Sequence, residues 1–254
     1  MLYQEPTLFP VAPVETEPNR TRPLVIGHRG ASLVAYENTI AAFIAARDQG
    51  ADGVELDVHA TADGNLVVHH DAAAEGVGIL AERTVAEITD ALPFVPTLDA
   101  VLDVCTGLLV NIEIKNSPND SDFDRDEGVA SAVVELLQSR NMLDRVLVSS
   151  FHLPSIDRVR ELDAGIDTGY LFVLDPTVLV AAGIAAERGH SAIHPFFGVL
   201  AGESAAELID AAHAQGLQVN VWTVNDEAEM IRLANAGVDA IMTDSPELAH
   251  RVLG

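Results

Sequence analysis

Short apolar runs recur along the chain, and segments with helical spacing separate them. Runs of this kind, bounded by turn residues, are typical of β-strands. Strands that alternate with helices, without an interdomain linker, predict a parallel α/β sheet. The predicted strands are residues 24–27, 51–58, 109–115, 146–151, 168–173, 191–194, 217–223 and 238–243.

The length suits a closed form of such a sheet. At 254 residues the chain fits one TIM (β/α)₈ barrel, which typically has about 250. We expect a single barrel domain over 23–254, after a leader at 1–22 that lacks the pattern of a signal peptide. The Asp63-Gly64 pair predicts a hairpin turn after the second strand. The segment 72–96 that follows is short, so we expect it to form at most a cap over the site.

The charge of the chain limits its partners. With 14 basic and 39 acidic residues, the formal charge is −25, which argues against nonspecific binding to nucleic acid or to anionic membranes. An anionic substrate must therefore be attracted by a local site. We expect no membrane span, because no run of about 20 apolar residues occurs. The single cysteine, Cys105, excludes an intramolecular disulfide and suggests a reducing, cytoplasmic location.

Two strands carry charged residues between apolar ones. In the run Gly53–Val58, Glu55 and Asp57 point to the face opposite Val54 and Leu56. Burial beside each other would raise the pKa values of both carboxylates, and a hard cation such as Mg²⁺, Ca²⁺ or Mn²⁺ would remove that cost. An ordinary strand with two acids on its solvated face is the alternative.

A second strand, 110–115, repeats this pattern. Glu113 and Lys115 point away from Ile112 and Ile114. In a closed parallel barrel one side of every strand faces the interior. We therefore expect Glu113 to converge with Glu55 and Asp57 at one end of the barrel, with Lys115 at the rim. This second strand favours a metal site over the alternative.

Several short motifs resemble the glycerophosphodiester phosphodiesterase family. They occur in the family's order from about Val25 to Pro246, nearly the whole chain. Each motif is weak by itself, and together they are specific. They are His28-Arg29-Gly30, Glu37-Asn38-Thr39, Gly50-Ala51-Asp52, Glu55-x-Asp57, Thr61-x-Asp63-Gly64, Val67-Val68-x-His70-Asp71, Glu113-x-Lys115, Trp222-Thr223-Val224-Asn225 and the segment from Gly237 to Asp244.

The resemblance implies metal-dependent hydrolysis of glycerophosphodiesters to sn-glycerol 3-phosphate and an alcohol, with a small molecule as the partner. The implied catalytic residues are His28 and His70, a general acid/base pair. Strand alternation allows only one of His69 and His70 to face the site, and the family pattern selects His70. The other implied residues are Glu55, Asp57 and Glu113 for one divalent cation, Mg²⁺ or Ca²⁺, Arg29 and Lys115 for phosphate, and Trp222 for the alcohol side of the substrate.

Three alternatives stay open. The family's cap stretch is only partly kept at residues 80–84, so a lysophospholipase D that acts on longer-chain lysophospholipids is one of them. A noncatalytic barrel of the same fold is another. A barrel of the amidohydrolase type would also hold metal, but its first strand carries His-x-His, whereas here that strand ends in His28 alone. The sequence does not predict an oligomeric state.

Overall fold

A computed structural model describes residues 22–202 and 204–254. The predicted leader at 1–22 lies outside these residues, except for Arg22. Arg22 pairs with Asp52 at 2.6 Å, close to the start of the first strand. Within the described part of the chain, no helix is long and apolar enough to cross a membrane.

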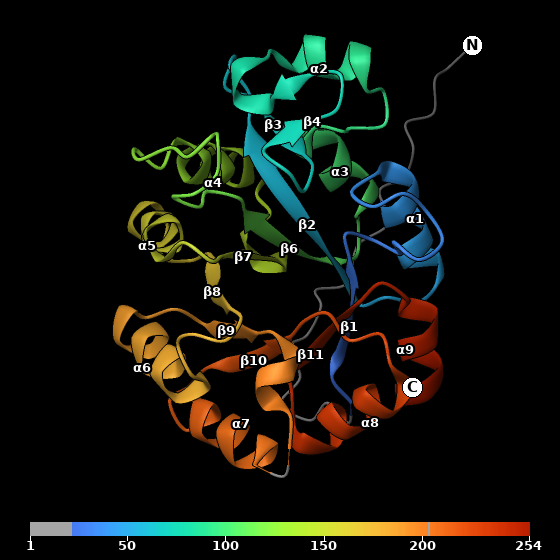
Figure 1. Ribbon diagram of the computed structural model, residues 1–254, viewed down its shortest axis with the longest axis vertical. Coiled ribbons are helices and arrows are strands. Elements are labelled where there is room, and N and C mark those ends of the chain that lie inside the picture. The colour runs from blue at the N-terminus through green and yellow to red at the C-terminus, as the bar shows by residue number, and fades with distance from the viewer. Residues whose placement is uncertain (1–21, 203) are drawn as a thin grey trace, which may run out of the picture.

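Eight parallel strands close into the predicted TIM barrel (Figure 1). Their order around the barrel is β1-β11-β10-β9-β8-β7-β6-β2, and pairing of β1 with β2 completes the closure. The barrel strands are β1 (Leu24–His28), β2 (Gly53–Ala60), β6 (Leu109–Ile114), β7 (Val146–Ser150), β8 (Asp167–Phe172), β9 (Ala192–Pro195), β10 (Gln218–Val221) and β11 (Ala240–Thr243).

Helices surround the barrel on its outer face (Figure 1). Several begin at a side chain that accepts a hydrogen bond from a backbone N–H of the first turn: Thr39 caps α1, Thr97 caps α3 and Asp226 caps α8. The helices are α1 (Ile40–Asp48), α2 (Val85–Ala91), α3 (Leu98–Val104), α4 (Gly128–Arg140), α5 (Leu153–Leu162), α6 (Val178–Arg188), α7 (Ala205–His213), α8 (Glu227–Ala236) and α9 (Pro246–Leu253).

The alternation along β2 explains why its acids face inward. Val54, Leu56 and Val58 are fully buried in the layer between strands and helices, where they join one hydrophobic cluster with α1, α3 and α4. Period-two alternation then directs Glu55 and Asp57 into the barrel. A second cluster fills the same layer under α6, α7 and α8. Burial of apolar side chains on the helix side thus fixes which residues line the interior.

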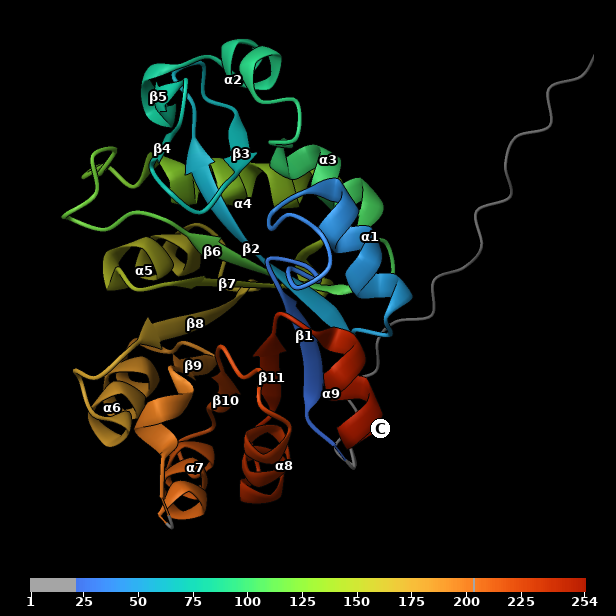
Figure 2. The ribbon, with the colours of Figure 1, turned by 45° about the vertical axis from the view of Figure 1, so that its right-hand side comes forward.

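The insertion after β2 forms as predicted. The turn around Asp63-Gly64 brings β3 (Leu66–Val68) back antiparallel to β2. A two-stranded sheet of β4 (Ala73–Ala74) and β5 (Gly78–Ile79) then stands with α2 above the barrel (Figure 2). A capping box between Thr84 and Glu87 starts α2. The cap has a small hydrophobic cluster of its own beneath α2.

Candidate active site

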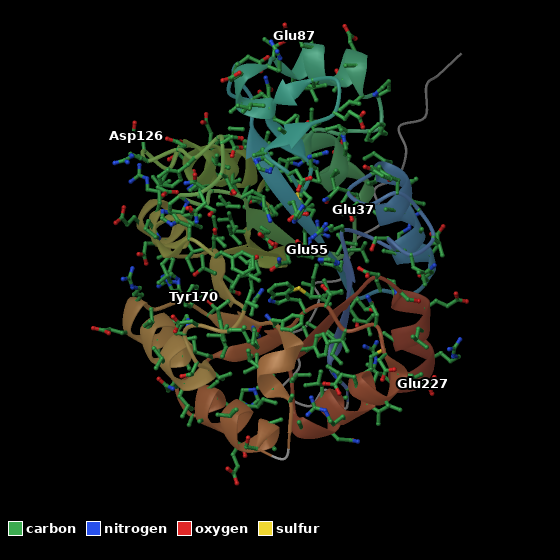
Figure 3. The ribbon with its side chains drawn as sticks, viewed as in Figure 1. Glu37, Glu55, Glu87, Asp126, Tyr170 and Glu227 are labelled. Carbon is green, nitrogen blue, oxygen red and sulfur yellow. The ribbon has the colours of Figure 1, made fainter. Side chains whose placement is uncertain are left out.

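A cavity of about 140 Å³ lies where the barrel strands end. This is the end at which barrel enzymes keep their chemistry. Every predicted site residue except Asp57 lines it, and Asp57 contacts two of those that do. Figure 3 shows Glu55 near the centre of the barrel, whereas Glu87, Asp126 and Glu227 lie at its periphery. The structure therefore brings the predicted residues together.

The three predicted metal ligands form one cluster. Glu55, Asp57 and Glu113 are buried, and each offers an oxygen within 4.8 Å of the others. The register of the sheet explains the proximity, because Asp57 and Glu113 are partners across the β2–β6 pair. Burial and repulsion by Asp57 raise the pKa of Glu55 to about 8. Burial also raises the pKa of Glu113, although the nearby Lys115 opposes it.

The cationic side chains of the site contact Asp57 and Glu113 but not Glu55. Lys115 Nζ lies 2.9 Å from Glu113 and 3.6 Å from Asp57, and the Arg29 guanidinium contacts Asp57 at 3.3 Å. Asn38 also donates an amide N–H to Asp57 at 2.8 Å. Glu55 instead accepts the backbone N–H of Arg29 at 3.0 Å. The cluster therefore fits a hard divalent cation, which would neutralise Glu55 most directly and lower its pKa.

The loop after β1 places Arg29 between these acids. Arg29 and Asn38 both adopt the left-handed conformation, and the Asn38 N–H donates to the Arg29 carbonyl at 3.0 Å. Gly30 lies so close to α1 that a β-carbon would be 2.6 Å from Ala42, so only glycine fits there. Glu37 pairs with the Arg29 guanidinium at 2.9 Å and so braces the Arg29 side chain.

His28 is held by a carboxylate from the far end of the chain. Its Nδ1 donates to Asp244 Oδ1 at 2.7 Å, and Asp244 also accepts bonds from Ser32 and Asn225. The Thr223 hydroxyl lies 3.4 Å from Nε2. Burial lowers the pKa of His28, but the Asp244 bond and the charge of Glu55 outweigh it, so the pKa is raised. The bond from His28 in turn lowers the pKa of Asp244, against the effect of burial.

Asp244 is a site residue that the sequence reasoning missed. Asp244 closes the motif from Gly237 onward, which the resemblance includes without giving any residue in it a role. Asp244 directly follows β11, the strand that pairs with β1 in the barrel, so a predicted barrel order would place it near His28. Only the closed strand order shows that residues 28 and 244 meet.

His70 is held by its neighbour in the chain. Its Nδ1 lies 2.7 Å from Asp71 Oδ1. Burial and the charge of Lys115 lower the pKa of His70, and they outweigh the bond to Asp71. His69 points elsewhere, to the Asp71 carbonyl, and His59 pairs with Asp122 at 2.6 Å. Of these three histidines, His70 lines the cavity, whereas His59 and His69 do not.

Trp222 forms an aromatic wall of the cavity. Its ring packs edge-on against Phe151 at 5.6 Å and against Phe196 at 5.7 Å, measured between ring centroids. Its Nε1 donates to the His194 carbonyl at 2.8 Å, which fixes the plane of the indole. The His194 side chain itself lies deeper, bonded to Asn220, and burial lowers its pKa to about 3. His194 does not line the 140 Å³ cavity.

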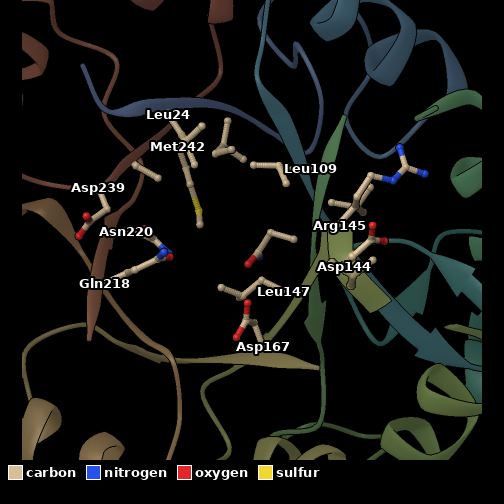
Figure 4. Close-up of a pocket in the computed structure, with 15 residues that line it drawn as sticks. Leu24, Leu109, Asp144, Arg145, Leu147, Asp167, Gln218, Asn220, Asp239 and Met242 are labelled. Atoms are coloured by element: carbon tan, nitrogen blue, oxygen red, sulfur yellow. The ribbon is translucent and has the colours of Figure 1, made fainter. Parts of the chain in front are cut away.

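A larger cavity, of about 320 Å³, opens at the opposite end of the barrel (Figure 4). Leu24, Leu109 and Leu147 line it near the starts of their strands, and Asn220 and Met242 point into it from deeper in the barrel. The clustered acids and both paired histidines lie at the other end of the strands. The smaller cavity is thus the candidate active site, although it has less volume.

Comparison with known proteins agrees with this geometry. Residues 28–248 match the Glycerophosphoryl diester phosphodiesterase family. The chain belongs to the glycerophosphoryl diester phosphodiesterase family. The resemblance found in its motifs is confirmed, and so is the predicted enzyme class, a phosphoric diester hydrolase. Membership also rules out the amidohydrolase alternative.

Relatives in this family match over most of their length. The chain is 36% identical to the glycerophosphodiester phosphodiesterase of Caldanaerobacter subterraneus subsp. tengcongensis, over 88% of the chain and 95% of the relative. A phosphodiesterase from Oleispira antarctica, solved in complex with the product sn-glycerol-3-phosphate, superimposes with a TM-score of 0.79. It shares 27% identity, over 91% of this chain and 96% of that one. The family enzyme from Thermotoga maritima gives a TM-score of 0.77 at 28% identity, over 90% and 97%.

Proposed function

We propose that the chain hydrolyses glycerophosphodiesters to sn-glycerol 3-phosphate and an alcohol, using a divalent cation and the two paired histidines. One observation carries the proposal: three buried acids, two cationic side chains and both histidines meet at one cavity. The sn-glycerol-3-phosphate bound by the Oleispira antarctica relative supports the choice of substrate class.

The cation is Mg²⁺ or Ca²⁺, held by Glu55, Asp57 and Glu113. When bound, it supplies Lewis-acid stabilisation of charge on the phosphate oxygens. Arg29 and Lys115 bind the remaining phosphate charge, Arg29 through its planar fork and Lys115 as a point charge. Both side chains already lie against the acid cluster, so they are positioned before the substrate arrives.

The two histidines divide the proton transfers. His28, with its raised pKa, is the group that holds a proton near neutral pH and gives it to the leaving alcohol. His70, with its lowered pKa, is neutral and accepts the proton of the attacking hydroxyl. That hydroxyl is either the 2-hydroxyl of the substrate, which gives a cyclic phosphate, or a water molecule.

Two further assignments belong to the proposal. Trp222 packs against the alcohol part of the substrate, because it precedes Thr223, whose hydroxyl lies 3.4 Å from Nε2 of His28, the proposed proton donor to the leaving alcohol. We also propose a cytoplasmic location, since Cys105 is a free thiol that packs in the core beside α3.

An assay with glycerophosphocholine tests the function. The protein is stripped with EDTA and supplied with Mg²⁺ or Ca²⁺ in turn, and release of sn-glycerol 3-phosphate is measured. We expect activity that EDTA abolishes and one of the two cations restores. A fully loaded protein that hydrolyses no member of a panel of glycerophosphodiesters would instead identify a noncatalytic barrel.

A further inference from the structure

His59 lies on the inward face of β2, beyond the acid cluster, but it does not line the catalytic cavity. Period-two alternation places its side chain on the same face as Glu55 and Asp57, roughly 7 Å beyond Asp57 at about 3.3 Å per residue. The side chain is only 1% exposed. A buried histidine needs hydrogen-bond partners, and the partners of this one connect it to the proposed chemistry.

Both ring nitrogens of His59 face oxygen atoms. Nδ1 lies 2.6 Å from Asp122 Oδ2, and Nε2 lies 3.2 Å from the main-chain carbonyl oxygen of His70. Carboxylate and carbonyl oxygens accept hydrogen bonds, so each ring nitrogen acts as a donor. The ring therefore joins the loop after β6, which carries Asp122, to the segment after β3, which carries His70.

The bond to His70 matters because the sheet no longer holds this residue. β3 ends before it, and the last main-chain bond of the β2–β3 pair joins the His69 N–H to β2 at 3.1 Å. Among the described residues, the main chain of His70 has no hydrogen-bond partner other than the His59 ring. The side-chain partner of His70 is Asp71, which is 73% exposed. His59 is thus the buried contact that fixes His70 relative to the barrel.

The other end of the His59 ring is anchored in the interior as well. The Asp122 side chain is 4% exposed, and within the described part of the chain His59 is the only hydrogen-bond partner of its carboxylate. A buried carboxylate without a partner is costly, so the bond to Nδ1 is retained and fixes the orientation of the ring. The contacts run without a break from Asp122 through His59 to His70.

We propose that His59 is a positioning residue, which holds the main chain of His70 so that the His70 ring lies in the cavity, and that Asp122 orients His59. The inference rests on the proposed function, which gives His70 its part in the proton transfers. His59 does not line the cavity, so it acts only through His70. Both positioning residues lie outside the motifs that carry the family resemblance.

Two substitutions of His59 separate its two bonds. Glutamine can place an amide N–H where Nε2 lies, so His59→Gln keeps the bond to His70. Asparagine reaches only the position of Nδ1, so His59→Asn keeps the bond to Asp122 and loses the bond to His70. His190→Asn is the matched control, because His190 is also buried, lies 3.3 Å from an aspartate and does not line the cavity.

Kinetics on glycerophosphocholine and the crystal structure of each variant are the two measurements. We expect His59→Asn to lower kcat roughly ten- to a hundredfold, since a displacement of about 1 Å can cost a hundredfold. KM and the melting temperature gained on adding the cation should change little, because the phosphate and cation ligands remain. His59→Gln should restore most of the rate, and His190→Asn should leave it unchanged. Asp122→Ala, in a loop, should lower kcat by less than His59→Asn.

Equal rates in His59→Asn and His59→Gln overturn the inference, and so does a His70 ring that keeps its position in the crystal structure of His59→Asn. Both results leave the proposed function standing. If His59→Asn does not fold, an unchanged kcat in Asp122→Ala overturns the inference instead. Unmodified protein that hydrolyses no glycerophosphodiester overturns the proposed function, whereas a displaced His70 ring in His59→Asn would still support the positioning contact.

Discussion

The two histidines of the site make the same contact in different surroundings. Each presents Nδ1 to an aspartate at 2.7 Å. His28 reaches Asp244 across 216 positions of sequence, whereas His70 uses the next residue, Asp71. The His28 side chain is 17% exposed and that of His70 is 37% exposed.

This comparison shows that a carboxylate partner does not by itself decide the pKa of a histidine. Burial lowers both values, and both aspartates raise them. Nearby charges decide the direction of each shift, because Glu55 helps to raise the pKa of His28 and Lys115 helps to lower the pKa of His70. The charges around the two histidines therefore shift their pKa values in opposite directions, which is what the proposed division into an acid and a base requires.

Removing the charge at the centre should have the largest effect. Glu55→Gln takes away a proposed cation ligand and the negative charge beside His28, and we expect the activity to fall to the level measured in EDTA. The melting temperature gained on adding Mg²⁺ or Ca²⁺ should also be lost. Glu227→Gln is the control, because Glu227 lies in the first turn of α8 at the periphery of the barrel. An EDTA-resistant rate in Glu55→Gln would contradict the cation site.

The pKa of Glu55 gives this gain in melting temperature a pH dependence. A carboxyl whose pKa rises from 4.5 to about 8 on folding stabilises the metal-free protein below pH 4.5, and this contribution is lost as the pH rises to 8. A cation must displace the proton to bind below pH 8. Thermal melts should therefore show a larger gain from the cation at pH 8.5 than at pH 6. An equal gain at both pH values would show that Glu55 is not a ligand.

Substitution of the histidines should cause the next largest loss of activity. His28→Ala and His70→Ala should each lower kcat/KM at least roughly a hundredfold, the low end for general acid–base catalysis. The double variant should cost much less than the product of the two, because the residues act together. His69→Ala is the control and should be nearly neutral. If His69→Ala were inactive and His70→Ala active, the register of this segment would be wrong by one residue.

The two aspartates should move different limbs of the pH profile. We expect a bell-shaped profile of kcat/KM, with the acidic limb set mainly by His70 and the alkaline limb mainly by His28. Asp244→Asn removes the negative charge from the partner that raises the pKa of His28, so the alkaline limb should shift to lower pH. Asp71→Asn should shift the acidic limb to lower pH by less. Movement of the same limb by both variants would contradict the division of roles.

Trp222→Ala should have the smallest effect on activity. Trp222 is proposed to bind the alcohol part of the substrate, which leaves on the side of His28. If the indole binds the alcohol equally in the ground and transition states, KM rises and kcat changes little. Trp222→Phe, which keeps an aromatic ring, serves as the matched control. Steady-state kinetics on glycerophosphocholine measure both constants. A large loss of kcat at constant KM would place Trp222 in the chemical step.

The sequence predicts those parts of this molecule that depend on local pattern. Alternation along β2 and β6 is enough to predict that Glu55, Asp57 and Glu113 converge, because burial on the helix side leaves the acids only the interior. The hairpin at Asp63-Gly64 follows from turn chemistry in the same way. These features need only neighbours in sequence or a known barrel geometry.

Other features depend on closure of the whole barrel, which no local pattern encodes. Asp244 acquires its partner only when β11 pairs with β1. The β4–β5 pair is too short and too rich in alanine and glycine to give a strand signal. The directions of the histidine pKa shifts depend on Glu55 and Lys115, whose distances from the rings follow from tertiary packing.

The pairing of His28 with Asp244 also affects when the site is completed during synthesis and folding of the chain. During synthesis the first strand emerges long before residue 244, and the acid cluster of β2 and β6 can form without it. His28, the proposed general acid, in contrast lacks its partner Asp244 until the last barrel strand has docked. Catalytic activity should therefore be the final property that the growing chain acquires, and it can serve as a direct readout of when the barrel has closed.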